Sequence, residues 1–226
     1  MEDISATADK DGLAFVQEQM AKYKDEQYVK GWDSLWNSGK KLPWDKHMPH
    51  PALVEMLVEK MTIIGGPIVE TAVVARDPET HEIINDSSEK SQGSSPPAKV
   101  HQGSPSMPSQ RRKKALVPGC GRGVDVLLLA SFGYDAYGLE YSEMALEACK
   151  QELEQNGHKY PVHDNTIGAG KVTFVQGDFF DDTWFETLGL TRHSFDLIYD
   201  YTVYFTYTPL PYHWTWFSQD LAGAVL

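Results

Sequence analysis

The stretch Ala115-Leu-Val-Pro-Gly-Cys-Gly-Arg-Gly-Val-Asp-Val126 decides the fold class of this chain. A short apolar run leads into a glycine-rich turn, and the turn opens an apolar segment of helical length that ends at Gly133. A second short run then closes on an acidic residue, Glu140, about twenty residues past the glycines. This order of strand, glycine turn, helix and strand ending in an acid predicts a Rossmann-like α/β unit that binds an adenosine-containing cofactor.

The spacing of the glycines indicates the class of cofactor. A dinucleotide fingerprint has glycine or alanine at its sixth position, where the helix amides face a pyrophosphate. Counted from Gly119, the sixth position is Val124, so the pattern is Gly-x-Gly-x-Gly, which is typical of S-adenosylmethionine sites. Glu140 is then expected to accept hydrogen bonds from two ribose hydroxyls. A nicotinamide-dependent oxidoreductase and an ordinary glycine turn of an α/β protein are the alternatives at this point.

The sequence after residue 113 alternates between short apolar runs and helix-length segments, which predicts parallel strands joined by right-handed crossovers. The expected strands span 115–118, 135–140, 172–176 and 195–201, and the expected helices span 123–132, 143–155 and 181–189. Ser142 is a favourable N-cap for the second of these helices.

We divide the chain into four parts. Residues 1–66 are expected to form an N-terminal cap over the cofactor site, with a helix at 51–64 and an irregular, tryptophan-rich stretch at 31–50. Residues 67–112 are an insertion that we expect to be largely disordered, because 86–110 are nearly empty of large apolar residues. The Rossmann-like domain spans 113–205, and 206–226 form a divergent tail.

Composition limits the partners that the chain can have. A net charge of −12 argues against nucleic acid and against an anionic membrane surface, because both are bound through clustered Lys and Arg. Two cysteines and eight scattered histidines show no metal-ligand spacing. We find neither an apolar run long enough to span a membrane nor a secretory signal, so we expect a soluble cytoplasmic protein, and we expect it to be a monomer.

Four motifs in order resemble the thiol and halide methyltransferases of plants and fungi, which belong with the thiopurine S-methyltransferase family. They are Gly31-Trp-Asp-x-x-Trp36, Pro43-Trp-Asp45, Val117-Pro-Gly-Cys-Gly-Arg-Gly-Val-Asp-Val126 and Phe195-Asp-Leu-Ile-Tyr-Asp-Tyr201. The resemblance implies a class I S-adenosylmethionine-dependent methyltransferase fold with S-adenosyl-L-methionine as cofactor. It also implies a small thiol or related nucleophile as the methyl acceptor: bisulfide, thiocyanate or halide.

The resemblance further implies a set of binding residues. They are the cofactor-covering Trp32, Trp36 and Trp44, the turn residues Gly119 and Gly121, the ribose acid Glu140, the adenine pair Asp178 and Phe179, and Tyr201 at the cofactor and acceptor site. Structural alternatives remain for several: the tryptophans and Tyr201 as core residues, and Asp178 as a helix cap. The sequence identifies no catalytic base, and none is required for a soft anion.

Residues 206–226 do not match the further helix and strands with which the family's domain continues. We therefore expect a C-terminally truncated member, with strands in the order 3-2-1-4 and the strand at 195–201 as an unprotected edge. The alternative function is a catalytically impaired S-adenosylmethionine-binding fragment or pseudoenzyme.

Overall fold

The computed structural model describes residues 4–24, 27–71, 109–201 and 224–225. The chain separates into two compact units, one made of residues 1–67 with 112–226 and the other of residues 68–111. The smaller unit holds strands β1 (Ile68–Thr71) and β2 (Ser109–Arg112), which pair in a two-stranded sheet. Most of the insertion expected to be disordered, residues 72–108, lies outside the described residues.

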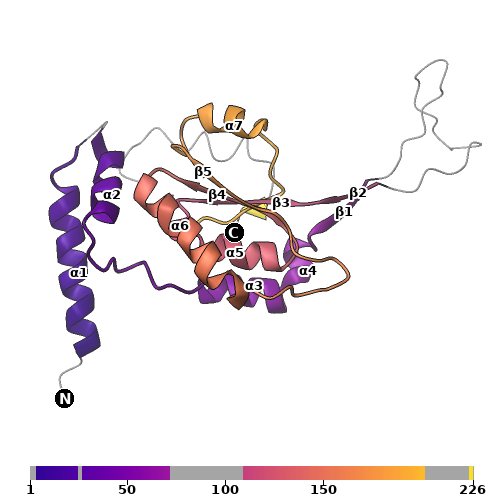
Figure 1. Cartoon of the computed structure of the whole chain (residues 1–226), viewed down its shortest axis with the longest axis horizontal. Coiled ribbons are helices and arrows are strands. Elements are labelled where there is room, and N and C mark those ends of the chain that lie inside the picture. The colour runs from indigo at the N-terminus through magenta and orange to yellow at the C-terminus, as the bar shows by residue number, and fades with distance from the viewer. Residues whose placement is uncertain (1–3, 25–26, 72–108, 202–223, 226) are drawn as a thin grey trace, which may run out of the picture. The chain divides into compact units, whose positions relative to one another are not determined.

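The larger unit is built on a parallel sheet of order β5-β4-β3-β6-β7 (Figure 1). Its strands are β3 (Lys114–Pro118), β4 (Asp135–Glu140), β5 (Val172–Gln176), β6 (Leu197–Ile198) and β7 (Ala224–Val225). Each neighbouring pair runs parallel. The first four strands have the order expected from the sequence, so the predicted Rossmann-like α/β architecture is confirmed.

The prediction that the fourth strand forms an open edge is wrong. Residues Leu197 and Ile198 of β6 pair in parallel with Ala224 and Val225 of β7. A strand of two residues has no alternation that a sequence can reveal, which is why the tail gave no strand signal. β6 is likewise shorter than the predicted 195–201, so Tyr201 lies beyond the hydrogen-bonded strand.

Helices cover both faces of the sheet, and alternate residues of each strand supply the two cores. On one face, Leu53 and Leu57 of α3 (Pro51–Glu59) pack with Val117 of β3 and with α5 (Val124–Ser131). On the other face, Leu116 packs with Trp184 of α7 (Thr183–Leu188). Figure 1 shows α7 on the opposite side of the sheet from α3 and α5.

Local signals set several helix ends as predicted. Helix α6 (Glu143–Asn156) begins at Ser142, whose Oγ accepts the amide of Ala145 at 3.3 Å. Helix α5 is followed by Gly133 in a left-handed conformation, φ +97°. The single helix predicted at 51–64 is instead broken at Lys60, which leaves a short helix α4 (Met61–Ile64). After α6 the chain makes a 3₁₀ turn, η2 (Gly157–Lys159).

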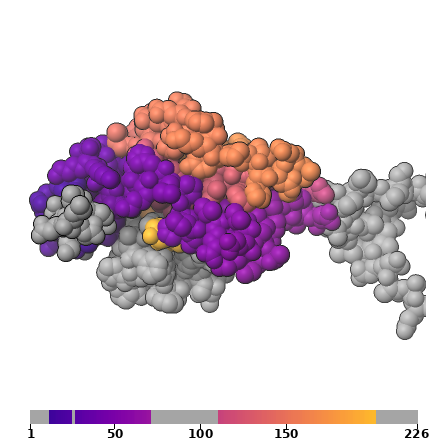
Figure 2. Space-filling view, turned by 90° about the horizontal axis from the view of Figure 1, so that it is seen from below, coloured from indigo at the N-terminus to yellow at the C-terminus, as the bar shows by residue number. Residues whose placement is uncertain are grey.

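The cap contains a helix where the sequence suggested irregular chain. Helix α2 (Tyr28–Asn37) follows α1 (Ile4–Met20) and carries two of the pocket tryptophans. Gly31 lies inside α2 at a close approach to α1, since a Cβ there would lie 2.7 Å from Sδ of Met20. α2 contacts α6, and Figure 2 shows the N-terminal residues, indigo to purple, against later residues in orange. Among the described residues, none of the helices is long and apolar enough to cross a bilayer.

Candidate functional site

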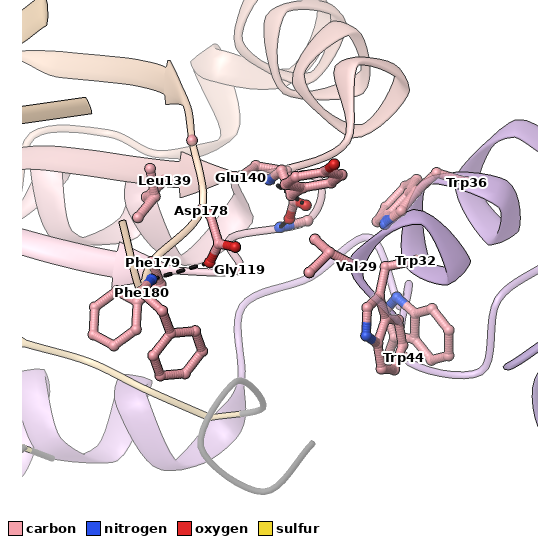
Figure 3. Close-up of a pocket in the computed structure, with 13 residues that line it drawn as sticks. Val29, Trp32, Trp36, Trp44, Gly119, Leu139, Glu140, Asp178, Phe179 and Phe180 are labelled. Carbon is pink, nitrogen blue, oxygen red and sulfur yellow. Dashed lines mark hydrogen bonds between the residues drawn. The ribbon is translucent and has the colours of Figure 1, made fainter. Parts of the chain in front are cut away.

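A pocket of about 170 Å³ lies between the cap and the carboxyl ends of β3, β4 and β5. In Figure 3 the three tryptophans stand on one side and the residues that follow β5 on the other. Ligands of open parallel sheets bind at these strand ends. The lining brings together the predicted residues Trp32, Trp36, Trp44, Gly119, Gly121, Glu140, Asp178 and Phe179.

Glu140 is fixed in place by its own surroundings. Its Oε2 accepts the amide of Gly121 at 2.9 Å, and its Oε1 accepts the amides of Tyr141 at 2.9 Å and Ser142 at 3.1 Å. Only 7% of the residue is exposed, and this burial raises the pKa of its carboxyl above the usual range, while the three amides act in the opposite direction. The carboxylate is therefore rigidly positioned at the end of β4, where it can accept further donors from a ligand.

The glycine-rich turn uses its backbone donors internally. The amide of Cys120 donates to Leu139 O at 3.1 Å, that of Gly121 donates to Glu140, and that of Gly123 donates to Cys120 O at 2.8 Å. A pyrophosphate site needs such amides to point at the phosphates. These three amides are already engaged, so this turn does not suit a dinucleotide.

The tryptophans belong both to the pocket and to the core of the cap. The rings of Trp32 and Trp44 meet edge-to-face with centroids 5.4 Å apart. The pocket tryptophans also pack against a small buried cluster of Val16, Leu35 and Leu42. The tryptophans therefore both pack in the core of the cap and line the pocket. The indole N–H of Trp32 is buried and has no hydrogen-bond acceptor in the part of the chain that the structure describes.

Asp178 does not cap the helix that follows it. Its Oδ1 accepts the amide of Phe180 at 3.0 Å, a turn drawn in Figure 3, whereas the first amide of α7, that of Thr183, is accepted by Asp181 at 2.9 Å. The turn places the carboxylate of Asp178 and the ring of Phe179 on the pocket wall. At such a wall the carboxylate can accept a hydrogen bond from an amino group of a base, and the aromatic ring can stack on that base.

Tyr201 is the predicted site residue that the structure does not bring to the pocket. It is 53% exposed, and its ring lies against that of His50 with centroids 4.0 Å apart. The backbone of His50 is in turn held by Asp125, which accepts its amide at 2.8 Å.

Sequence reasoning missed five lining residues. They are Val29, Leu139, Tyr141, Gly177 and Phe180. All but Val29 are immediate neighbours of predicted residues, so the motifs pointed to them. Val29 has helical spacing to Trp32 and Trp36, and this signal was missed because both tryptophans fall in the stretch 31–50 that we expected to be irregular.

Neither thiol near the turn is suited to act as a nucleophile. The Sγ atoms of Cys120 and Cys149 lie 3.9 Å apart, and Cys149 donates to Gly121 O at 2.9 Å. Hydrogen bonding to Cys149 and burial hold the pKa of Cys120 well above its usual value. Among the described residues, no group of His, Cys, Asp and Glu is arranged to hold a metal ion.

Gly121 is expected to be sensitive to a single methyl group. It has φ +53°, and a Cβ there would lie 3.2 Å from Cζ2 of Trp36. We expect Gly121→Ala to lower stability by about 1–2 kcal/mol through the left-handed backbone, and also to weaken ligand binding by displacing the Trp36 ring. Gly39→Ala is the matched control, because Gly39 has φ +66° with nothing within 4 Å. Equal effects of both changes on binding would show that the Trp36 contact is unimportant.

Comparison with known proteins assigns the chain to a family. A family model described as Thiopurine S-methyltransferase (TPMT) matches residues 92–212, more than half of the chain. The chain belongs to this family. Its parallel sheet, with a glycine turn at the end of β3, is that of the class I S-adenosylmethionine-dependent methyltransferase fold. The resemblance noted in the sequence is therefore confirmed for the family and for the fold.

Individual relatives carry related names. "Thiocyanate methyltransferase 1" of Brassica oleracea is 38% identical over 119 residues, 52% of this chain and 44% of the relative. "Probable thiol methyltransferase 2" of Arabidopsis thaliana is 27% identical over 179 residues, 79% of this chain and 50% of the relative. This chain thus spans about half the length of the curated relatives it matches. A solved structure titled "Conversion of a Disulfide Bond into a Thioacetal Group during Echinomycin Biosynthesis" has 21% identity and a TM-score of 0.45, covering 79% of this chain and 48% of that chain.

Proposed function

We propose that this chain transfers the methyl group of S-adenosylmethionine to a small thiol or a related nucleophile. The observation that carries the proposal is Glu140, a carboxylate fixed at the end of β4 beside a glycine turn whose amides are already engaged. Such an arrangement suits a ribose diol without an adjoining pyrophosphate. Membership of the thiopurine S-methyltransferase family supports the reaction class.

The chemistry of the lining fits this cofactor. Among the described residues that line the pocket there are two carboxylates, Glu140 and Asp178, and no Lys, Arg or His. A site of this charge suits a molecule that carries a sulfonium and an ammonium and disfavours one that carries phosphates. A sulfonium against an aromatic face gains about 0.5–2 kcal/mol, and the tryptophans of the cap offer such faces.

In this proposal the residues of the chain bind the cofactor, orient it toward the methyl acceptor and exclude water from the reacting centre. S-adenosylmethionine, when bound, supplies an electrophilic methyl carbon on a good leaving group. In our proposal Glu140 accepts the ribose hydroxyls, Asp178 and Phe179 hold the adenine, and the tryptophans shield the reacting centre from solvent. Bisulfide, thiocyanate and halide ions need no base, and an ordinary thiol is a few per cent ionised at neutral pH. We therefore assign no catalytic base.

The activity is tested with labelled S-adenosylmethionine and a panel of acceptors: bisulfide, thiocyanate, iodide, an aromatic thiol and a thiopurine. We expect enzyme-dependent methyl transfer to at least one sulfur nucleophile, with an oxygen nucleophile such as a catechol as the negative control. Transfer to the catechol alone would contradict the proposed acceptor class.

A second candidate is a chain that binds the cofactor without turning it over. It is favoured by the position of Tyr201, which the family resemblance assigns to the acceptor side but which lies outside the pocket. Binding of S-adenosylhomocysteine together with no turnover on any member of the panel would support this candidate. Protection of the protein by NAD but not by S-adenosylhomocysteine would instead revive the oxidoreductase interpretation.

A further inference from the structure

Two polar contacts, which we call the clasp, join the cap to the unit that carries the glycine turn. Asp45 and Arg122 form a bidentate ion pair, with Nε to Oδ1 at 2.8 Å and Nη2 to Oδ2 at 2.5 Å. Ser142 donates its hydroxyl to Asp33 Oδ1 at 2.8 Å. The ion pair is largely shielded from solvent, since the side chains of Arg122 and Asp45 are 19% and 11% exposed.

Each of the four residues of the clasp adjoins or contacts a residue that lines the pocket. Asp33 follows Trp32 and Asp45 follows Trp44, so both cap residues adjoin pocket tryptophans. Arg122 follows the lining residue Gly121, and Ser142 donates its amide to Glu140. The clasp therefore ties the segments that carry the pocket tryptophans to the glycine turn and to the start of α6.

A second carboxylate acts electrostatically on Arg122. Glu152 of α6, only 4% exposed, also attracts the guanidinium, although the hydrogen bonds to Asp45 are the main cause of the raised pKa of Arg122. If the cap lifts, Asp45 departs but Arg122 retains the attraction of Glu152. The free-energy cost of separating Arg122 from Asp45 is then lower than for a shielded cation left with no negative partner. The ion pair can therefore break and re-form as the cap opens and closes.

We propose that Asp45 and Arg122 are positioning residues that hold the tryptophan cap over the cofactor, and that breaking their ion pair limits the release of S-adenosylhomocysteine. The inference rests on the proposed function, since it assumes that this product occupies the pocket. Shielded ion pairs at an interface act mainly on dissociation rates, because the pair must separate before the complex can open.

The direct test is the dissociation rate of S-adenosylhomocysteine, followed by tryptophan fluorescence after rapid dilution of the complex. Arg122→Gln is expected to release it about tenfold faster or more, with a matching rise in Kd. Asp45→Asn should act in the same way, and the double variant should be no worse than either single one. Arg192→Gln is the matched control. Arg192 forms an ion pair with Asp182, the two side chains are 33% and 47% exposed, and neither residue lines the pocket.

A merely structural role predicts a different pattern. It would lower Tm and the binding-competent fraction measured by calorimetry, while Kd and the release rate of the folded fraction stayed at the wild-type values, and that result would overturn the proposal. Should Arg122→Gln not fold, Arg122→Lys takes its place, because it keeps the charge but loses the bidentate fork.

Failure of the proposed function can be told apart from failure of the clasp. If the wild-type chain does not bind S-adenosylhomocysteine, the function is wrong, and the clasp is tested on the ligand-free protein by hydrogen exchange of residues 28–45. Faster exchange in Arg122→Gln than in wild type and Arg192→Gln is expected of a clasp that holds the cap. Equal exchange in all three proteins would refute it.

Discussion

Glu140→Ala is expected to weaken S-adenosylhomocysteine binding by about 10- to 150-fold and to destabilise the fold as well. The binding loss corresponds to about 1.5–3 kcal/mol for hydrogen bonds between ribose hydroxyls and a charged acceptor. The stability loss, about 2–4 kcal/mol, arises because the amides of Gly121, Tyr141 and Ser142 lose their acceptor. Calorimetry gives the Kd of the folded fraction, and thermal melts give the stability.

Glu154→Ala is the control for charge, because it removes an exposed carboxylate from α6. We expect it to leave both the Kd and the melting temperature nearly unchanged. Equal affinity of wild type and Glu140→Ala for S-adenosylhomocysteine would show that Glu140 does not bind the ribose, whatever the change in stability.

The pH dependence of the Glu140 effect has a definite sign. Burial raises the pKa of Glu140 in the folded protein, so the proton-linked part of its contribution to stability is present below its unfolded pKa and is lost as the pH rises through the raised value, whereas its hydrogen bonds to the three amides remain. Ligand hydroxyls donate best to the ionised form, so affinity for S-adenosylhomocysteine should rise over the same pH range. This opposition between stability and affinity should be absent from Glu140→Ala.

Gly170→Ala is expected to destabilise the larger unit by about 3 kcal/mol or more, which lowers Tm by roughly 6–12 °C for a chain of this size. A Cβ at Gly170 would lie 1.8 Å from the carbonyl oxygen of Tyr134 and 2.9 Å from the amide of Asp135. Both obstacles are backbone atoms, so no side-chain rotation can relieve the clash. Residue 170 therefore has to be glycine for the chain to pass close beside Tyr134 and Asp135 just before it enters β5.

Gly66→Ala provides the comparison, because a Cβ there would meet nothing within 4 Å and its φ is not in the left-handed region. We expect Gly66→Ala to melt within about 2 °C of wild type, as for a surface substitution without a special conformation. Equal melting temperatures for the two variants would mean that the segment before β5 is not packed as the structure has it.

The elements that were predictable from sequence are those whose causes are local. The bounds of β4 and the N-cap of α6 followed from an apolar run ending at Glu140 and from Ser142 placed before a helical pattern. The glycine turn was equally readable, because its conformation depends on residues within the turn. Most of the pocket lining followed, since lining residues occur next to one another in the motifs.

The elements that were missed depend on partners that are distant in sequence. The helical part of the stretch at 31–50 was missed, and Gly31 within it is accounted for by a close approach to Met20 of α1. β7 is defined only by pairing with Leu197 and Ile198. The position of Tyr201 depends on β6 ending at Ile198 and on the ring of His50, neither of which is encoded near Tyr201.

The central claim is that the pocket between the tryptophan cap and Glu140 is the cofactor site. A crystal structure of the full chain with S-adenosylhomocysteine tests it most directly. We predict the ribose hydroxyls on the carboxylate of Glu140, the adenine beside Asp178 and Phe179, and the sulfur facing the tryptophans. A complex with the ligand elsewhere, or with its ribose away from Glu140, would contradict the account.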